Sequence, residues 1–137
     1  MSWNKMIPQE EIQKKITATT VNFAEEFGKY LAQTEEGTSP LTTTQLRKFF
    51  GEVKRQQMMT GYDETEFVML KPKLAYAVGR AKQNGKRGIY LKIEDFYKVM
   101  ADAIDKVIVS PDKNTAFRNF ITAFEAIVAY HKAAEKK

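Results

Sequence analysis

Hydrophobic residues recur at three- and four-residue steps along most of the chain, a spacing typical of amphipathic helices. The first stripe predicts one helix over residues 12–31. Thr42 and Gln45 have the spacing of a capping box, so a second helix is expected to begin there and to end near Thr60. The buried stripe of this second helix comprises Leu46, Phe49, Phe50 and Val53.

Two more helices are expected in the middle of the chain. Pro72 suits the first turn of a third helix, which is predicted to be buried along one face as far as Ala81. Residues 83–88 have the sequence QNGKRG, which does not easily continue a helix and predicts a loop. Hydrophobic residues over 96–107 then predict a fourth helix.

A fifth helix is predicted near the C-terminus, with Ser110 as its N-cap, Pro111 in its first turn and a buried stripe that reaches His131. Residues 88–91 are the one candidate strand, and a single strand has no partner. The patterns therefore predict an all-α fold, a compact bundle of about five helices, with residues 1–137 in a single domain.

The composition agrees with a folded intracellular protein. With 137 residues, 43% of them hydrophobic and 28% charged, the chain is large enough to bury one core. It has no Cys, so disulfides and thiolate metal ligands are excluded, which fits a reducing cytoplasm. No apolar run is long enough for a membrane span, and charges interrupt the N-terminal segment. A soluble, cytoplasmic protein is therefore expected.

The charges are distributed unevenly along the chain. Between Leu46 and Lys92 there are eleven Lys and Arg but only four Asp and Glu, a local charge of +7 in a chain whose total is +5. The other residues therefore sum to −2. One cationic face on a small protein most commonly binds a phosphate backbone, although basic helical faces are also often just solvated.

Helical periodicity groups the basic residues of the second helix. Arg47 and Lys54, seven residues apart, are expected on one flank of the buried stripe, with ~10.5 Å between them. Lys48 and Arg55 are expected to point directly away from the core. Lys48 and Arg55 either contact phosphates or are simply solvated.

The third helix has a comparable arrangement. Lys73, Tyr76 and Arg80 are expected on one flank. Tyr76 either contacts a base or ribose, or is a half-buried ring whose hydroxyl reaches solvent. The candidate nucleic-acid-binding residues are Arg47, Lys48, Lys54, Arg55, Lys73, Arg80, Lys82, Lys86 and Arg87.

Few residues could support catalysis. His131 continues the apolar face of the last helix, where a structural role is expected. Asp63, Glu64 and Glu66 lie close together, but negative charges are also favourable in the first turn of a helix. With no Cys and one His, no transition-metal site is expected, and the glycine spacing does not match a phosphate-binding loop. The sequence predicts a protein that is not an enzyme and has no cofactor.

Four blocks of the sequence resemble one known family. They are residues 41–48 (LTTTQLRK), 52–54 (EVK), 69–80 (MLKPKLAYAVGR) and 124–132 (FEAIVAYHK). Together they are similar to the small subunit of the type III-A CRISPR-Cas (Csm) effector complex, over about residues 41–132. The first 40 residues carry no such resemblance.

The resemblance implies a small helical bundle without catalysis of its own. In such complexes several copies stack beside the backbone subunits and line the channel that holds the CRISPR RNA and the target single-stranded RNA. Target cleavage belongs to the backbone subunit, and the DNase and cyclic oligoadenylate activities belong to the large subunit. The small subunit would hold the RNA backbone while base pairing reads the sequence.

Two other functions fit parts of the pattern. A helical protein-interaction module would use its basic residues for solubility and would not bind RNA in a salt-sensitive way. A helix-turn-helix DNA-binding protein would need base-reading side chains at the start of its recognition helix, where residues 72–75 (PKLA) offer chiefly a cation. RNA binding within a CRISPR complex is therefore the main expectation.

Overall fold

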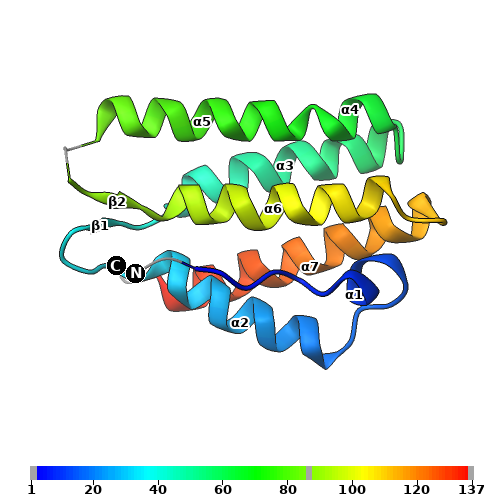
Figure 1. Cartoon of the computed structure of the whole chain (residues 1–137), viewed down its shortest axis with the longest axis horizontal. Helices are drawn as coiled ribbons and strands as arrows, with labels where there is room; N and C mark the ends of the chain where they lie inside the picture. The colour runs from blue at the N-terminus through cyan, green and yellow to red at the C-terminus, as the bar shows by residue number, and fades with distance from the viewer. Residues whose placement is uncertain (1–2, 86–87, 136–137) are drawn as a thin grey trace.

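The computed structural model describes residues 3–85 and 88–135. These residues form seven helical segments and two very short strands (Figure 1). Five of the helices are long, so the prediction of an all-α bundle is confirmed. The helices are α1 (Gln9–Gln13), α2 (Ala18–Ala32), α3 (Thr43–Met59), α4 (Glu64–Val68), α5 (Leu70–Asn84), α6 (Lys92–Ile108) and α7 (Lys113–Ala134). The strands are β1 (Thr38–Ser39) and β2 (Tyr90–Leu91).

Helices α6 and α7 form the centre of the bundle. They contact each other, α5 packs on α6, and both α2 and α3 pack on α7. Figure 1 shows α5 and α2 on opposite sides of this central pair. The buried hydrophobic residues of the long helices form one continuous cluster.

A row of phenylalanine rings on α7 joins the helices around it. Phe120 packs edge-on against Phe67 of α4, with ring centroids 5.1 Å apart. Phe124 lies 5.1 Å from Phe50 of α3 and 5.7 Å from Phe96 of α6. Phe50 is only half-buried, so the stripe predicted for α3 reaches the surface at this residue, whereas Phe124 is fully inside.

The single helix predicted over residues 12–31 is wrong, because the chain breaks into α1 and α2. Thr17 has an extended backbone and caps α2. The buried carboxylate of Glu11 accepts hydrogen bonds from the backbone N–H groups and hydroxyls of Thr17 and Thr20, at 2.6 to 3.2 Å. Burial raises the pKa of Glu11, but these four hydrogen bonds outweigh it and lower the pKa. Glu11 therefore satisfies the free donors at the start of α2.

Residues 88–91 find a partner, contrary to the prediction. Strand β2 pairs in parallel with β1, and the Tyr90 N–H donates to the Gly37 carbonyl oxygen at 2.8 Å. Gly37 has a φ of +79° in the turn before β1, a conformation that favours glycine. The pairing links the connection between α2 and α3 to the start of α6.

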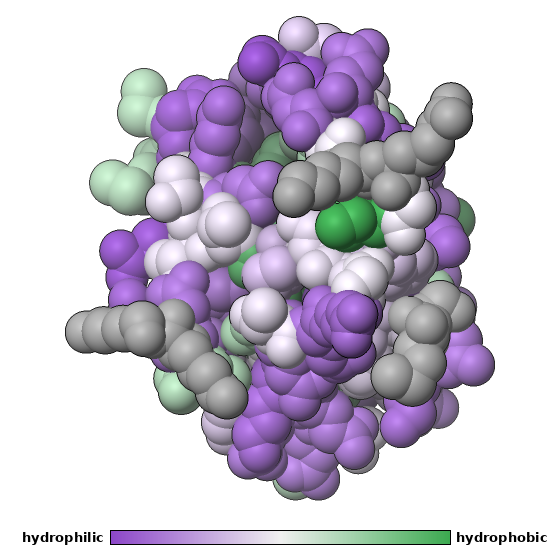
Figure 2. All heavy atoms as spheres, turned by 90° about the vertical axis from the view of Figure 1, so that its left-hand side faces the viewer, coloured by the Kyte–Doolittle hydropathy of each residue, from purple (hydrophilic) through white to green (hydrophobic). Residues whose placement is uncertain are grey.

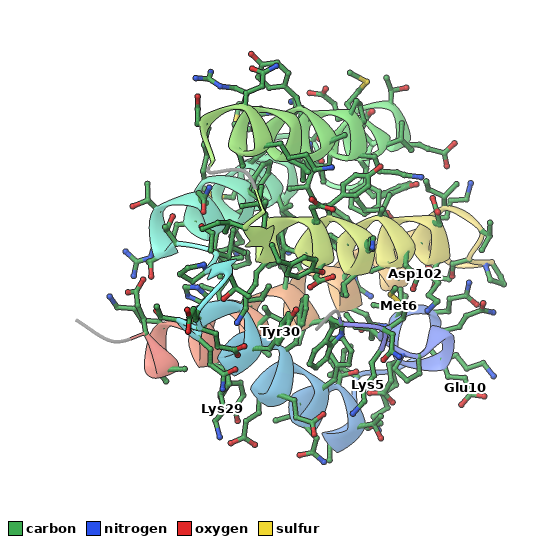
Figure 3. The ribbon with its side chains drawn as sticks, turned by 60° about the vertical axis from the view of Figure 1, so that its left-hand side comes forward. Lys5, Met6, Glu10, Lys29, Tyr30 and Asp102 are labelled. Atoms are coloured by element: carbon green, nitrogen blue, oxygen red, sulfur yellow. The ribbon has the colours of Figure 1, made fainter. Side chains whose placement is uncertain are left out.

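A buried polar cluster fastens the same end of the bundle. The Lys92 ammonium, which is 1% exposed, donates to the carbonyl oxygens of Tyr30 at 2.6 Å and Gln33 at 3.0 Å. Asp95 accepts hydrogen bonds from the hydroxyls of Tyr30, labelled in Figure 3, and Tyr90. Burial lowers the pKa of Lys92, while burial together with the Asp95 carboxylate raises the pKa of both tyrosines. The cluster joins α2, β2 and α6.

The last helix begins two residues later than predicted. Asp112 is the N-cap, and its carboxylate accepts from the Thr115 N–H at 3.1 Å. Ser110 is buried, and its hydroxyl accepts from the Asp112 N–H at 3.3 Å. Ser110 therefore orders the turn before the helix, and Pro111 lies in that turn.

Helices α2 and α7 approach closely at Gly28 of α2. A β-carbon at this position would lie 2.7 Å from the His131 backbone nitrogen and 2.8 Å from the Tyr130 β-carbon. His131 is buried at this crossing, and its Nε2 lies 2.6 Å from the carbonyl oxygen of Leu41. The histidine thus ties the end of α7 to the residue before the α3 cap.

Replacing Gly28 with Ala should destabilise the protein by about 1–3 kcal/mol, because α2 and α7 must separate to admit the methyl group. Gly51→Ala is the matched control, since an added carbon there has nothing within 4 Å. That exposed helical position should gain about 0.5–1 kcal/mol. Urea unfolding followed by circular dichroism measures both changes. Equal stability of the two variants would contradict the close approach of α2 and α7.

Candidate nucleic-acid interface

Residues of α3 and α5 line a groove. Figure 1 shows these two helices on the side of the bundle away from α2. The volume of the groove is about 800 Å³, and Ile93 of α6 contributes to its lining. The apolar lining is Phe49, Met69, Pro72, Tyr76, Ala77, Ala81 and Ile93. The polar lining is Gln45, Lys48, Glu52, Lys73, Arg80 and Asn84.

The structure brings several predicted site residues together in this groove. Lys73, Tyr76 and Arg80 all line it from α5, in agreement with the flank predicted for them. Lys48 lines it from α3, although its position predicts a side chain pointing straight into solvent. The groove therefore collects cations from two helices around one exposed tyrosine.

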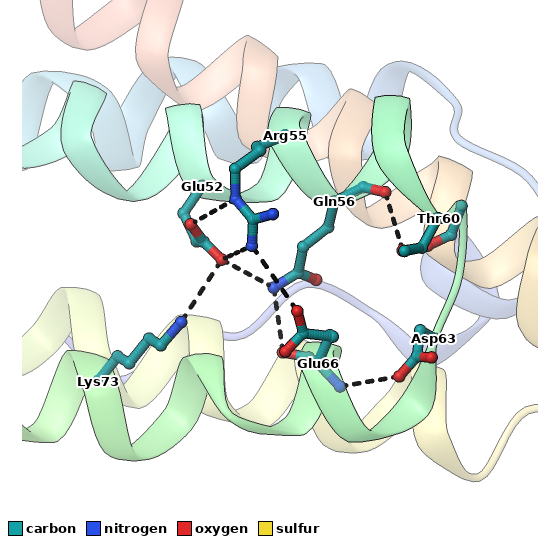
Figure 4. A network of polar contacts seen from close by, with 8 residues as sticks. Glu52, Arg55, Gln56, Thr60, Asp63, Glu66 and Lys73 are labelled. Atoms are coloured by element: carbon teal, nitrogen blue, oxygen red, sulfur yellow. Dashed lines mark hydrogen bonds and ion pairs between the residues drawn. The ribbon is translucent and has the colours of Figure 1, made fainter.

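One part of the groove is already neutralised by Glu52 (Figure 4). Arg55 donates two hydrogen bonds to this carboxylate, at 3.1 and 2.7 Å, and the Lys73 Nζ lies 3.5 Å from it. Outside the groove, Lys82 pairs with Glu94 at 3.3 Å. These three candidate cations have carboxylate partners within the chain, which weakens the field that each offers to a ligand.

Glu52 is ionised throughout the physiological pH range. The hydrogen bond from Arg55 is the main cause, burial opposes it, and Gln56 and Lys73 lower the pKa further, to about 2. The folded-state pKa thus lies below the ordinary value of 4.5. Ionised Glu52 therefore stabilises the fold at neutral pH, and this contribution is lost as the pH falls from about 4.5 towards 2.

Four candidate cations have no ion pair among the described residues, and three of these four are exposed. The exposed three are Arg47, Lys48 and Arg80. The Arg80 guanidinium lies 6.0 Å from the centre of the Tyr76 ring, within the range of a cation–π contact. These cations come from the N-terminal half of α3 and the C-terminal half of α5, which face each other because the two helices run antiparallel.

The remaining candidates contribute less to this end of the groove. Lys54 is half-buried, and its Nζ donates to the side-chain oxygen of Gln57 at 3.1 Å. Lys86 and Arg87 lie outside the described residues. Lys71, which is not among the candidates, pairs with Asp105 at 2.8 Å.

The groove also contains residues that the sequence pattern does not assign to a site. Phe49 forms part of its apolar wall, and Gln45 and Asn84 contribute carboxamides. A signal exists for Asn84, because it follows Tyr76 and Arg80 at four-residue steps and so shares their helical face. The sequence identifies Gln45 only as a capping residue, and the structure confirms that capping box.

The acidic residues near position 63 act at a helix start, as predicted. Asp63 caps α4 by accepting from the Glu66 N–H at 3.0 Å, and Glu64 pairs with Lys113 at 2.8 Å. In the part of the chain that the structure describes, no three His, Asp or Glu side chains converge to hold a metal ion. None of the described helices has both the length and the apolar character required to cross a bilayer.

Fold and groove together define a small helical bundle with a cationic face built from α3 and α5. Among protein families, the Csm2 Type III-A model matches residues 14–137. The chain belongs to this family, and it is therefore a small subunit of the type III-A Csm effector complex. The resemblance found over residues 41–132 is confirmed, and the match extends it to most of the N-terminal region. Comparisons with curated proteins and with solved structures each returned no match.

Replacing Glu52 with Gln should lower the stability by about 1–2 kcal/mol at pH 7, because Arg55 and Lys73 lose their anionic partner. The difference from the wild type should shrink as the pH falls below about 4.5 and vanish near pH 2, where wild-type Glu52 also becomes protonated. Denaturant unfolding at several pH values measures this. Glu125→Gln, at an exposed position, is the control and should change little. A pH-independent difference for Glu52→Gln would show that its charge is not involved.

Proposed function

We propose that this chain is the non-catalytic, RNA-binding small subunit of its complex and holds the backbones of the CRISPR RNA and the target single-stranded RNA. The observation that carries the proposal is that Lys48 and Arg80 line the α3/α5 groove without carboxylate partners among the described residues, and that Arg47, exposed next to Lys48 on α3, also lacks one. Membership of the Csm2 family and the local charge of +7 support it.

Phosphate binding is least costly at the unpaired cations. A phosphate that approaches Arg47, Lys48 or Arg80 displaces only water and counterions. At Arg55 and Lys73 it must compete with the Glu52 carboxylate. Arg47, Lys48 and Arg80 are therefore the primary contacts, and Lys54, Arg55, Lys73 and Lys82 are secondary contacts. Lys86 and Arg87 are candidates from the sequence alone.

The contribution of the chain to function lies in assembly. Its partners are the backbone and large subunits, further copies of itself, and RNA, all in the cytoplasm. The charge of −2 outside residues 46–92 supports a division of labour, because those surfaces do not repel neighbouring protein subunits through excess positive charge. Chemistry on RNA or DNA belongs to the other subunits.

Replacing Arg47, Lys48 and Arg80 together with Ala should weaken binding of single-stranded RNA and leave the melting temperature nearly unchanged, because all three are exposed. With about three to five phosphate contacts, the wild-type log-log salt slope should lie near −2 to −3.5. The triple variant should lose about two units of that slope. Fluorescence anisotropy at several salt concentrations measures both quantities.

A second triple variant separates a defined face from net charge. Lys14, Lys15 and Lys29 changed to Ala remove the same charge from the α1 and α2 side of the bundle, where Figure 3 labels Lys29. This control should retain most of the RNA affinity. Equal losses from the two triple variants would contradict a specific α3/α5 face. Glu52→Gln should act in the opposite direction and strengthen binding, because it frees Arg55 and Lys73.

In a reconstituted complex, the Arg47, Lys48 and Arg80 triple variant should lower target-RNA affinity and leave cleavage at saturating target close to normal, because the chemistry lies in another subunit. Single-turnover cleavage measures this, with the composition of the complex verified by mass. A large loss of rate in fully assembled complexes would show that this chain takes part in the chemistry, and the non-catalytic assignment would fail.

A further inference from the structure

An aromatic ring is exposed at the end of the α3/α5 groove where Lys48 and Arg80 have no carboxylate partner among the described residues. Tyr76 is 68% exposed, and its ring lies beside the Arg80 guanidinium. Phe49 and Ala77 provide apolar lining next to it. An exposed ring between cations offers a flat surface on which a base can stack, and bases of any identity have the π-face that stacking requires.

Two carboxamides lie where this groove continues into a second hollow. Gln45, Ala81 and Asn84 line both the groove and the adjoining hollow of about 490 Å³ beneath β1 and β2. Figure 2 views the molecule from this end, where hydrophilic residues surround a paler central area of intermediate hydropathy. The Gln45 side-chain oxygen accepts from the Thr42 N–H at 2.9 Å, and its NH₂ group has no hydrogen-bond partner among the described residues. The Asn84 side chain has no hydrogen-bond partner among the described residues, so its carboxamide is available to a ligand.

We infer that this end of the groove receives one unpaired base of a bound RNA strand. The base stacks on Tyr76, and the flanking phosphates lie on Lys48 and Arg80. The carboxamides of Gln45 and of Asn84, which is about 12 Å further along α5, face the neighbouring nucleotide. The inference rests on the proposed RNA binding and adds to it a site that contacts a base as well as the backbone.

The charge pattern favours a nucleotide over a helix from another protein. An amphipathic helix needs a continuous apolar groove for several of its turns. Here the apolar lining is interrupted at Glu52, which is ionised and bound to Lys73. The apolar, aromatic and cationic groups coincide only near Tyr76. That short stretch matches the size and chemistry of one nucleotide.

The test compares two labelled 12-mers, an oligoadenylate and the same sugar–phosphate backbone without bases. Wild-type protein should bind the oligoadenylate more tightly than the abasic strand. Tyr76→Ala should reduce affinity for the oligoadenylate about 5- to 150-fold, from a stacking contribution of ~1–3 kcal/mol per base, and leave the abasic strand unaffected. Tyr76→Phe keeps the ring and should keep the affinity. Circular dichroism should show unchanged folding, since Tyr76 is exposed.

The outcomes separate this inference from the proposed function. If wild type binds both strands equally and Tyr76→Ala changes neither affinity, the base site is refuted while RNA binding through the cations stands. If wild type binds neither strand, the proposed function fails as well. If Tyr76→Ala keeps its RNA affinity but no longer enters the reconstituted complex, a protein segment occupies the groove and the base site is overturned.

Discussion

The row of phenylalanine rings on α7 is the constraint on which the α3/α5 groove depends. Phe124 holds α3 through Phe50 and α6 through Phe96, and α5 packs on α6 with few contacts to α3. Helices α3 and α5 are thus attached to different neighbours, and a groove is left between them. A buried phenylalanine contributes about 3–5 kcal/mol, a large part of the stability of a small domain, so this geometry is strongly determined.

The same packing divides the groove electrostatically. At one end the C-terminal half of α3 faces the start of α5, where Glu52 binds both Arg55 and Lys73. At the other end Lys48 and Arg80 face each other without a carboxylate partner among the described residues. Both ends of the groove are built from helices, so the difference in charge pairing between the two ends is fixed by the fold.

The long helices and the Thr42 capping box could be predicted because helical periodicity and capping depend on residues that are close together in the sequence. The break at Thr17 could not, because it depends on Glu11 reaching two threonines across a turn. Strand β2 needed a partner at Thr38, far away in the sequence. Ser110 and Asp112 are residue types that serve equally well as N-caps. In the folded chain Ser110 is buried and Asp112 caps α7.

The candidate site was predicted as a surface, but the charge available to a ligand was overestimated. Of the eleven cations between Leu46 and Lys92, five have carboxylate partners, one donates to a side-chain amide, and two lie outside the described residues. Lys92 is even buried and ties α6 to the end of α2. Counting charges along a sequence cannot separate these from Arg47, Lys48 and Arg80, because each pairing with Glu94, Asp105 or Glu35 is made between segments distant in the chain. Of the three that remain, Lys48 and Arg80 line the same groove although they are 32 residues apart, because α3 and α5 are antiparallel, so the tertiary fold concentrates part of a diffuse basic segment at one place.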